Sequence, residues 1–341
     1  MFYRYEGERV FTLHVFCKAL KSIGSIESGR KKLLDFSAEE RLLNGNTHYG
    51  ICWCLALPGM KQRITIPKSI ASKHRYGQVF LTDLSWLNRE VEAVALSAND
   101  RVLEIGPAFG NLSRLVAPRV QQLLLIEIDR QFEPALTGLC NEFPNISLFW
   151  GDASTMELPS FDKVIGNLPY NIAFRMLCRI VLSPFDLGVF VIQDDMAARI
   201  VARPGTPGYS RASVTVQAYY EASRLFKIPK NAFSPIPAVH SACIKLGHRR
   251  PVKPLQEAFF KNALDLFFMD RHLPIGKIFR EDSQHLRLGK LYSALPALLR
   301  ERPVCQVSPP EFLELCRLMF EAGIKPRPIS DRVKQTRTQR R

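Results

Sequence analysis

The sequence predicts an α/β fold in which a doubly wound, Rossmann-like sheet is followed by a small helical domain. From about residue 84, short continuous apolar segments alternate with segments of helical periodicity, which is typical of a parallel sheet covered by helices. Hydrophobic residues make up 46% of the 341 residues and charged residues 23%, so the chain can bury a sizeable core. At this length, one catalytic domain and a smaller module are expected.

The predicted elements of the sheet region follow one another in strand–helix order. Buried strands are expected where the apolar run is continuous, at 101–105, 122–128, 146–150, 163–165 and 188–192. Helices are expected where apolar residues recur three to four positions apart, at 84–96, 111–118, 131–141 and 172–181. The loops after the strands should therefore gather at the carboxyl edge of the sheet, where open α/β sheets bind ligands.

Shifts in composition divide the chain into five expected parts. They are an N-terminal extension at 1–59, a basic arm at 60–83, a catalytic domain at 84–250, a helical domain at 251–323 and a basic tail at 324–341. Met60 is an alternative translation start, in which case the extension is not translated. A Pro-rich segment at 248–254 predicts a hinge, and Ser308 with Glu311 predicts a capped helix that ends near Ala322.

The charge balance favours a polyanionic partner. The chain has 47 Lys and Arg against 32 Asp and Glu, a net charge of +15, and such an excess favours contact with nucleic-acid phosphates. Solubility alone is the competing explanation. No apolar run is long enough to span a bilayer and no signal peptide is evident, so a cytoplasmic protein is expected. Of the eight cysteines only Cys52 and Cys54 lie close together, so no metal site is predicted.

Glycines and acids after the predicted strands indicate an adenosine-containing cofactor. Gly106 and Gly110 follow the first strand and allow the backbone to approach a ligand closely. Glu127 ends the second strand, where an acid can bind two ribose hydroxyls, and Asp152 after the third can accept from an adenine amino group. The loop at 106–110 lacks the Gly-x-Gly-x-x-Gly spacing that holds a diphosphate, which disfavours NAD.

The segment after the fourth strand, at 166–170, is the most specific motif for catalysis. An adenine N6 amine is a poor nucleophile, because its lone pair is delocalised into the ring. The side-chain oxygen of Asn167 and the carbonyl of Leu168 can accept its hydrogens and aim the lone pair at a methyl group, while Pro169 fixes the turn. Tyr170 can stack on one face of an extruded base, and Phe233 is predicted to cover the other face.

Together these motifs resemble the ribosomal RNA adenine N6-dimethyltransferase family, and archaeal members most. The segments that carry the resemblance lie at 76–81, 104–110, 127–129, 151–153, 167–170, 209–213 and 233–241. The resemblance implies S-adenosylmethionine as cofactor and dimethylation of adenines in small-subunit ribosomal RNA. It also implies that the helical domain at 251–323 is an RNA-binding domain, and that the protein is a monomer that acts on the pre-ribosomal small subunit, with no membrane partner.

The resemblance also implies roles for individual residues. The implied cofactor-binding residues are Gln78, Val79, Leu81, Gly106, Glu127, Asp152 and Asn167. In the family, the positions of Val79 and Ala108 are usually polar and glycine respectively, and a basic residue is common where Asp194 stands. These departures leave a second function open, that of an assembly factor with weakened catalysis on the same fold. A mitochondrial-type transcription factor and a large-subunit rRNA enzyme are further alternatives. The intact motif at 167–170 favours an active enzyme.

Overall fold

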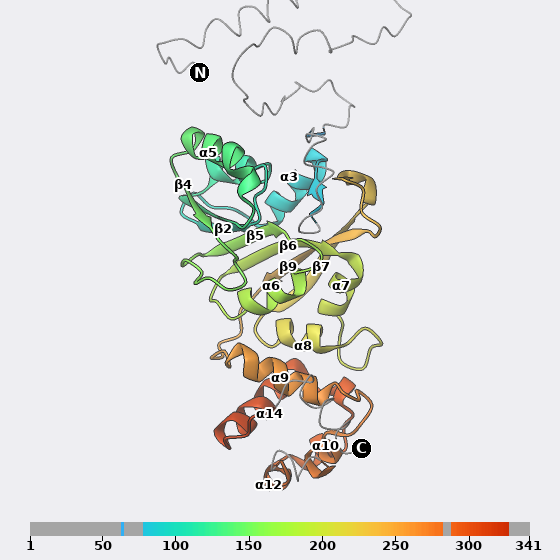
Figure 1. Cartoon of the computed structure of the whole chain (residues 1–341). Helices are drawn as coiled ribbons and strands as arrows, with labels where there is room; N and C mark the ends of the chain where they lie inside the picture. Colours follow the sequence, from blue (N-terminus) through green and yellow to red (C-terminus); the bar gives the residue numbers. More distant parts are fainter. Residues whose placement is uncertain (1–62, 65–77, 282–287, 327–341) are drawn as a thin grey trace, which may run out of the picture. The chain divides into compact units, whose positions relative to one another are not determined.

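The computed structural model describes residues 63–64, 78–281 and 288–326 (Figure 1). The predicted extension at 1–59, most of the arm at 60–83 and most of the tail at 324–341 lie outside these ranges. Within them, the chain forms a seven-stranded sheet with helices on both faces and a group of helices from residue 257 onward. No helix in this part of the chain is long and apolar enough to cross a membrane.

The large sheet has a parallel part and an antiparallel edge, in the strand order β4-β3-β2-β5-β6-β9-β7. Its strands are β2 (Arg101–Ile105), β3 (Gln122–Glu127), β4 (Ile146–Trp150), β5 (Lys163–Asn167), β6 (Leu187–Gln193), β7 (Glu221–Ile228) and β9 (Ser241–Gly247). The strands from β4 to β6 run parallel, and β9 is antiparallel to both β6 and β7. The five predicted strands are confirmed, with ends shifted by at most two residues.

The antiparallel strands β7 and β9 extend the parallel sheet at one edge and are not among the strands predicted from the sequence. β7 is the edge strand, so most of its side chains are exposed and its sequence lacks the continuous apolar run of a buried strand. β9 is almost entirely buried but directly follows a proline-rich segment at 235–237, which obscures its start. The sheet is thus a mixed, Rossmann-like sheet.

Side chains alternate along the strands and meet helices on opposite faces of the sheet. One face is covered by α3 (Leu84–Ala93), α4 (Ser113–Val116) and α5 (Glu133–Glu142). The other is covered by α6 (Ala173–Ile180), α7 (Asp194–Ile200) and α8 (Arg211–Gln217). The helix predicted at 111–118 is shorter than expected and continues as a 3-10 turn, η2 (Ala117–Arg119), because Pro118 has no N–H for a helical hydrogen bond.

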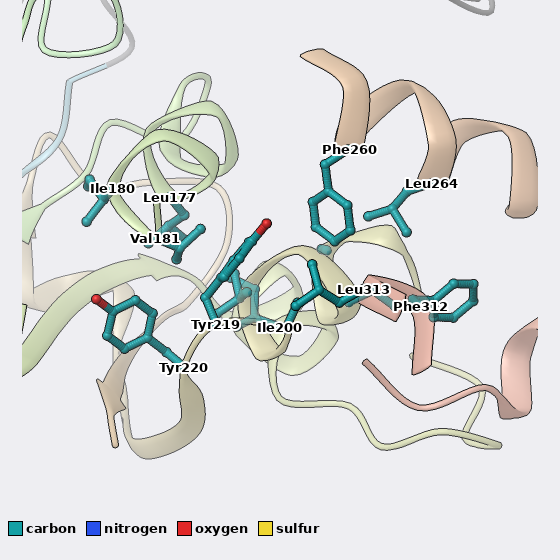
Figure 2. Close-up of a cluster of buried hydrophobic side chains, with 14 of the residues drawn as sticks. Leu177, Ile180, Val181, Ile200, Tyr219, Tyr220, Phe260, Leu264, Phe312 and Leu313 are labelled. Carbon is teal, nitrogen blue, oxygen red and sulfur yellow. The ribbon is translucent and has the colours of Figure 1, made fainter. Parts of the chain in front are cut away.

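The C-terminal helices share a core with the second of these faces. They are α9 (Glu257–Phe267), α10 (Ile275–Glu281), α12 (Gly289–Tyr292), α13 (Ala297–Arg300) and α14 (Pro309–Glu321). Figure 2 shows Phe260 and Leu264 of α9 and Leu313 of α14 gathered near Tyr219 and Ile200 in one buried cluster. The predicted domain boundary at residue 250 falls between β9 and α9, and it stays a prediction because this apolar core is continuous across it.

The predicted cap of the last long helix forms as expected. Ser308 donates its backbone N–H to Glu311 Oε2 at 2.9 Å, and its hydroxyl lies 2.7 Å from the same oxygen. Pro309 occupies the first turn of α14, where its missing N–H costs no helical hydrogen bond. The helix ends at Glu321, one residue before the predicted end.

Candidate active site

A cavity of about 290 Å³ lies at the carboxyl edge of the parallel strands. The segments after β2, β3, β4 and β5 build most of its wall, and β1 (Phe80–Leu81), α3 and α6 complete it. All the residues for which a cofactor-binding role is predicted line it: Gln78, Val79, Leu81, Gly106, Glu127, Asp152 and Asn167. They meet because parallel strands bring their carboxyl ends to one edge of the sheet. Their individual roles remain predictions.

The loop after β2 requires unusual backbone angles. Gly106, Ala108 and Gly110 have φ values of 70°, 50° and 74°. Glycine suits position 110 because of its positive φ, and a β-carbon there would also lie 2.8 Å from a methyl carbon of Leu139, whose side chain would have to shift. The N–H of Ala108 donates to Glu127 Oε2 at 3.0 Å, which ties the loop to the end of β3. The left-handed conformation of Ala108 costs roughly 1–2 kcal/mol.

We expect Ala108→Gly to raise the free energy of unfolding by roughly 0.5–1 kcal/mol, because relief of the left-handed strain exceeds the added entropy of the unfolded chain. Urea denaturation measures this change. Ala95→Gly is a matched control, since Ala95 also has φ 50° but is exposed and remote from the cavity. Both variants should gain stability, and only Ala108→Gly should alter affinity for a ligand of the cavity. A loss of stability in Ala108→Gly would contradict the inference that the left-handed backbone of Ala108 is strained.

Glu127 is buried, and backbone amides hold its carboxylate. Oε1 accepts from the N–H groups of Ile128 and Asp129, both at 2.9 Å, and Oε2 accepts from Ala108. Burial raises the pKa of Glu127, and these hydrogen bonds oppose the shift. No cation pairs with this carboxylate among the described residues. Its remaining lone pairs can therefore accept hydrogen bonds from the hydroxyl groups of a ligand.

Two further acids line the same cavity. Asp152 is half-buried in the turn after β4, and its Oδ1 accepts from the N–H of Ser154 at 2.8 Å. Glu104 lies in β2 and is buried beside the glycine loop. Burial raises the pKa of Glu104 to about 8, and the charge of Glu127 adds to the shift. At neutral pH a pKa of about 8 leaves Glu104 largely protonated, so Asp152 and Glu127 are the acids that can complement a ligand with positive charge and several hydroxyl groups.

The predicted catalytic motif leaves the end of β5 and turns into α6. Asn167 and Pro169 line the cavity, whereas the side chains of Leu168 and Tyr170 do not. The N–H of Leu168 donates to the carbonyl of Val191 at 3.1 Å, which fixes the orientation of this turn. Tyr170 Oη lies 2.5 Å from Ser241 Oγ, so the ring is anchored to the start of β9. Burial raises the pKa of Tyr170, so the phenol stays protonated at neutral pH.

Phe233 is not on the cavity wall. It lies in β8 (Phe233–Ser234), which pairs antiparallel with β1 so that Phe233 stands opposite Leu81. Its side chain is only 2% exposed and packs in the core on the α3 face of the sheet. Two motifs that lie far apart in the sequence, at 76–81 and 233–241, are therefore neighbours. A stacking role for Phe233 stays a prediction, and it would need this strand pair to move.

The acids that replace an expected basic residue after β6 are paired. Asp194 opens α7 and forms ion pairs with Arg224 and, at 3.4 Å, with Lys227, both from β7. Asp195 pairs with Arg199 one helical turn later, at 3.3 Å. Neither acid lines the cavity. Arg224 and Lys227 of the edge strand thus balance the negative charge of Asp194, and the cavity wall is unaffected.

Several residues of the cavity escape prediction from the sequence. Phe80 and Phe109 line it and make an edge-to-face contact with ring centroids 5.2 Å apart. Ile128 is exposed at its rim, and Arg175 of α6 is a cation in its wall. Phe80, Phe109 and Ile128 lie inside segments that carry the family resemblance, at 76–81, 104–110 and 127–129, and this position is the signal that could have indicated them. For Arg175 the sequence offers no signal. Among the described residues, no cluster of acids, cysteines and histidines suits a metal ion.

A Rossmann-like sheet with acids after successive strands and an Asn-Leu-Pro-Tyr turn in the same cavity defines a methyltransferase. The chain belongs to the ribosomal RNA adenine dimethylase family, whose model matches residues 70–319. It is an enzyme of this family and requires a methyl donor.

Similar proteins include archaeal relatives and two solved structures. A probable ribosomal RNA small subunit methyltransferase A of Methanosarcina acetivorans is 32% identical over 74% of this chain and 98% of its own length. The protein of the same name in Methanosarcina barkeri is 34% identical over 72% of this chain and 87% of its own. The fold is similar to a dimethyladenosine transferase from Plasmodium falciparum, with TM-score 0.62, 21% identity and coverage of 73% and 100%. The 23S rRNA methyltransferase ErmE has TM-score 0.52, 25% identity and coverage of 70% and 98%.

Proposed function

We propose that this enzyme transfers methyl groups from S-adenosylmethionine to N6 of adenines in small-subunit ribosomal RNA. The observation that carries the proposal is the meeting of Asn167 and Pro169 with Glu127 and Asp152 around one cavity. Membership of the ribosomal RNA adenine dimethylase family and the archaeal relatives support the choice of substrate. We further propose that the enzyme acts as a monomer in the cytoplasm.

The cavity residues suit S-adenosylmethionine. The amide-held carboxylate of Glu127 would accept from the ribose hydroxyls, and Asp152 would accept from the adenine amino group. Gln78, Val79, Leu81 and Gly106 would enclose the methionine end. The acids of the wall complement a sulfonium charge. When bound, the cofactor supplies an electrophilic methyl group.

The turn at 167–170 would prepare the adenine amine for attack. The side-chain oxygen of Asn167 and the carbonyl of Leu168 would accept the two N6 hydrogens, which localises the nitrogen lone pair toward the methyl group. N6 would take the methyl group that the cofactor supplies as the sulfur–carbon bond breaks, and N6 would then lose a proton to water. Tyr170, held by Ser241, would stack on the extruded base. Phe233 contributes only if the β1–β8 pair opens.

The proposal is tested by incubating the protein with methyl-labelled S-adenosylmethionine and unmethylated small ribosomal subunits. We expect label in N6-methylated adenine after nuclease digestion, and the mass of the labelled nucleoside distinguishes one methyl group from two. Protein-free large-subunit RNA is the control substrate and should remain unlabelled. Absence of label from a folded protein that still binds subunits would replace the proposal by an assembly-factor role on the same fold.

A further inference from the structure

Arg175 is the one cation among the described residues that line the cavity. The segment from Asn167 to Met176 runs along the cavity wall, and Ile172, Arg175 and Met176 face it at positions i, i+3 and i+4. Met176 is buried and Arg175 is exposed, so the guanidinium stands where the wall of α6 meets solvent. It therefore lies at the mouth of the cavity, a short distance along the chain from the catalytic turn.

The guanidinium of Arg175 has no ion-pair or hydrogen-bond partner among the described residues, although three carboxyl groups line the same cavity. Those acids are held in other ways. Backbone N–H groups bind Glu127 and Asp152, and Glu104 is buried. One turn farther along α6, Arg179 is held by the carbonyl of Met156 at 3.5 Å. Arg175 is thus a charged donor at the cavity that is left for a ligand.

The cofactor does not require this cation near its sulfonium, because the acids of the wall already complement that positive charge. A strand of RNA that presents an adenine to Asn167 brings phosphates to the cavity mouth, and guanidinium groups bind phosphate oxygens with two parallel hydrogen bonds. A backbone phosphate is therefore the ligand whose charge and place fit Arg175.

We infer that Arg175 binds a backbone phosphate of the RNA strand that carries the target adenine and so positions the base at Asn167. The inference rests on the proposed function, because it takes the second ligand of the cavity to be RNA. Arg175 is a positioning residue in this scheme, since it touches the strand and not the transferred methyl group.

The experiment compares the full-length wild type with Arg175→Gln, Arg175→Lys and a matched control, Arg119→Gln. Arg119 is exposed and precedes β3, so it lies at the amino edge of the parallel strands, whereas the cavity lies at their carboxyl edge. Binding of a fluorescent, adenine-containing single-stranded RNA is measured by anisotropy at several salt concentrations without cofactor. Loss of one phosphate contact should make the plot of log affinity against log salt shallower by about 0.7 in Arg175→Gln. Arg175→Lys should recover the wild-type slope, and Arg119→Gln should keep it.

Two further measurements separate RNA from cofactor. With small subunits, Arg175→Gln should raise KM about tenfold, while its Kd for S-adenosylmethionine, measured by calorimetry, should stay within about twofold of wild type. A wild-type salt slope in Arg175→Gln would overturn the inference. Weaker cofactor binding with unchanged RNA binding would overturn it too, and would assign Arg175 to the cofactor carboxylate. If the wild type transfers no methyl group, the proposed function fails, whereas the salt slope still decides the role of Arg175.

Discussion

Replacing Asn167 by alanine is expected to lower kcat for methyl transfer on the order of 100-fold or more, with a much smaller change in cofactor affinity. Asn167 ends β5 at the cavity wall, and its side-chain oxygen is the acceptor that would orient the amine. Removing one preorganised hydrogen-bonding group of this kind typically costs 10²–10³ in kcat. Single-turnover methyl transfer to small subunits gives the rate, and calorimetry with S-adenosylmethionine gives the affinity.

Asn167→Asp is the informative companion variant. Its carboxylate keeps an acceptor at the same place, so it should retain more activity than Asn167→Ala. Asn99→Ala is a matched control, because Asn99 is exposed in the loop before β2 and lies away from the cavity. Equal rates for wild type and Asn167→Ala would exclude the hydrogen-bonding role. A loss confined to cofactor affinity would assign Asn167 to cofactor binding alone.

The parallel strands and the cofactor side of the cavity are predictable because they depend on local patterns. A continuous apolar run indicates a buried strand wherever it occurs, and the residue after it must lie at the carboxyl edge. Glu127 and Asp152 could be placed in this way without knowledge of any long-range contact. The cap formed by Ser308 and Glu311 is local for the same reason.

The features that the sequence does not reveal depend on long-range pairing. The contact between Leu81 and Phe233 joins strands about 150 residues apart and buries Phe233, against the expectation from its motif. β7 is an edge strand whose polar residues hide its extended conformation. Glu90 shows the limit most clearly: a glutamate in a helix normally faces water, and only the packing of α3 on the sheet shows that this one does not.

Glu90→Leu is expected to raise the free energy of unfolding by about 1–3 kcal/mol at neutral pH, the range for the cost of a buried polar group that has no hydrogen-bond partner. Glu90 is fully buried, on the same helix face as Leu87 and Val91, and neither of its carboxyl oxygens has a hydrogen-bond partner among the described residues. An apolar residue of similar volume would complete the cluster around Cys243 and remove a polar group without a partner.

The gain should grow with pH, and this dependence distinguishes the charge of Glu90 from its packing. Burial, and after it the charge of Glu104, raises the pKa of Glu90 well above its usual value. Above pH 4.5 the unfolded chain has lost this proton while the folded chain keeps it, so the wild type loses stability as pH rises toward the folded-state pKa.

Urea unfolding at pH 6, 7 and 8 should show a widening gap in the free energy of unfolding between Glu90→Leu and wild type. Glu90→Gln should remove the same slope while keeping an amide without a partner. Glu92→Leu, at an exposed position two residues farther along α3, should change neither stability nor slope appreciably. A gap that stays constant with pH would show that Glu90 is ionised in the folded protein as it is in the unfolded chain. A less stable Glu90→Leu would show that its carboxyl group is satisfied in the folded protein.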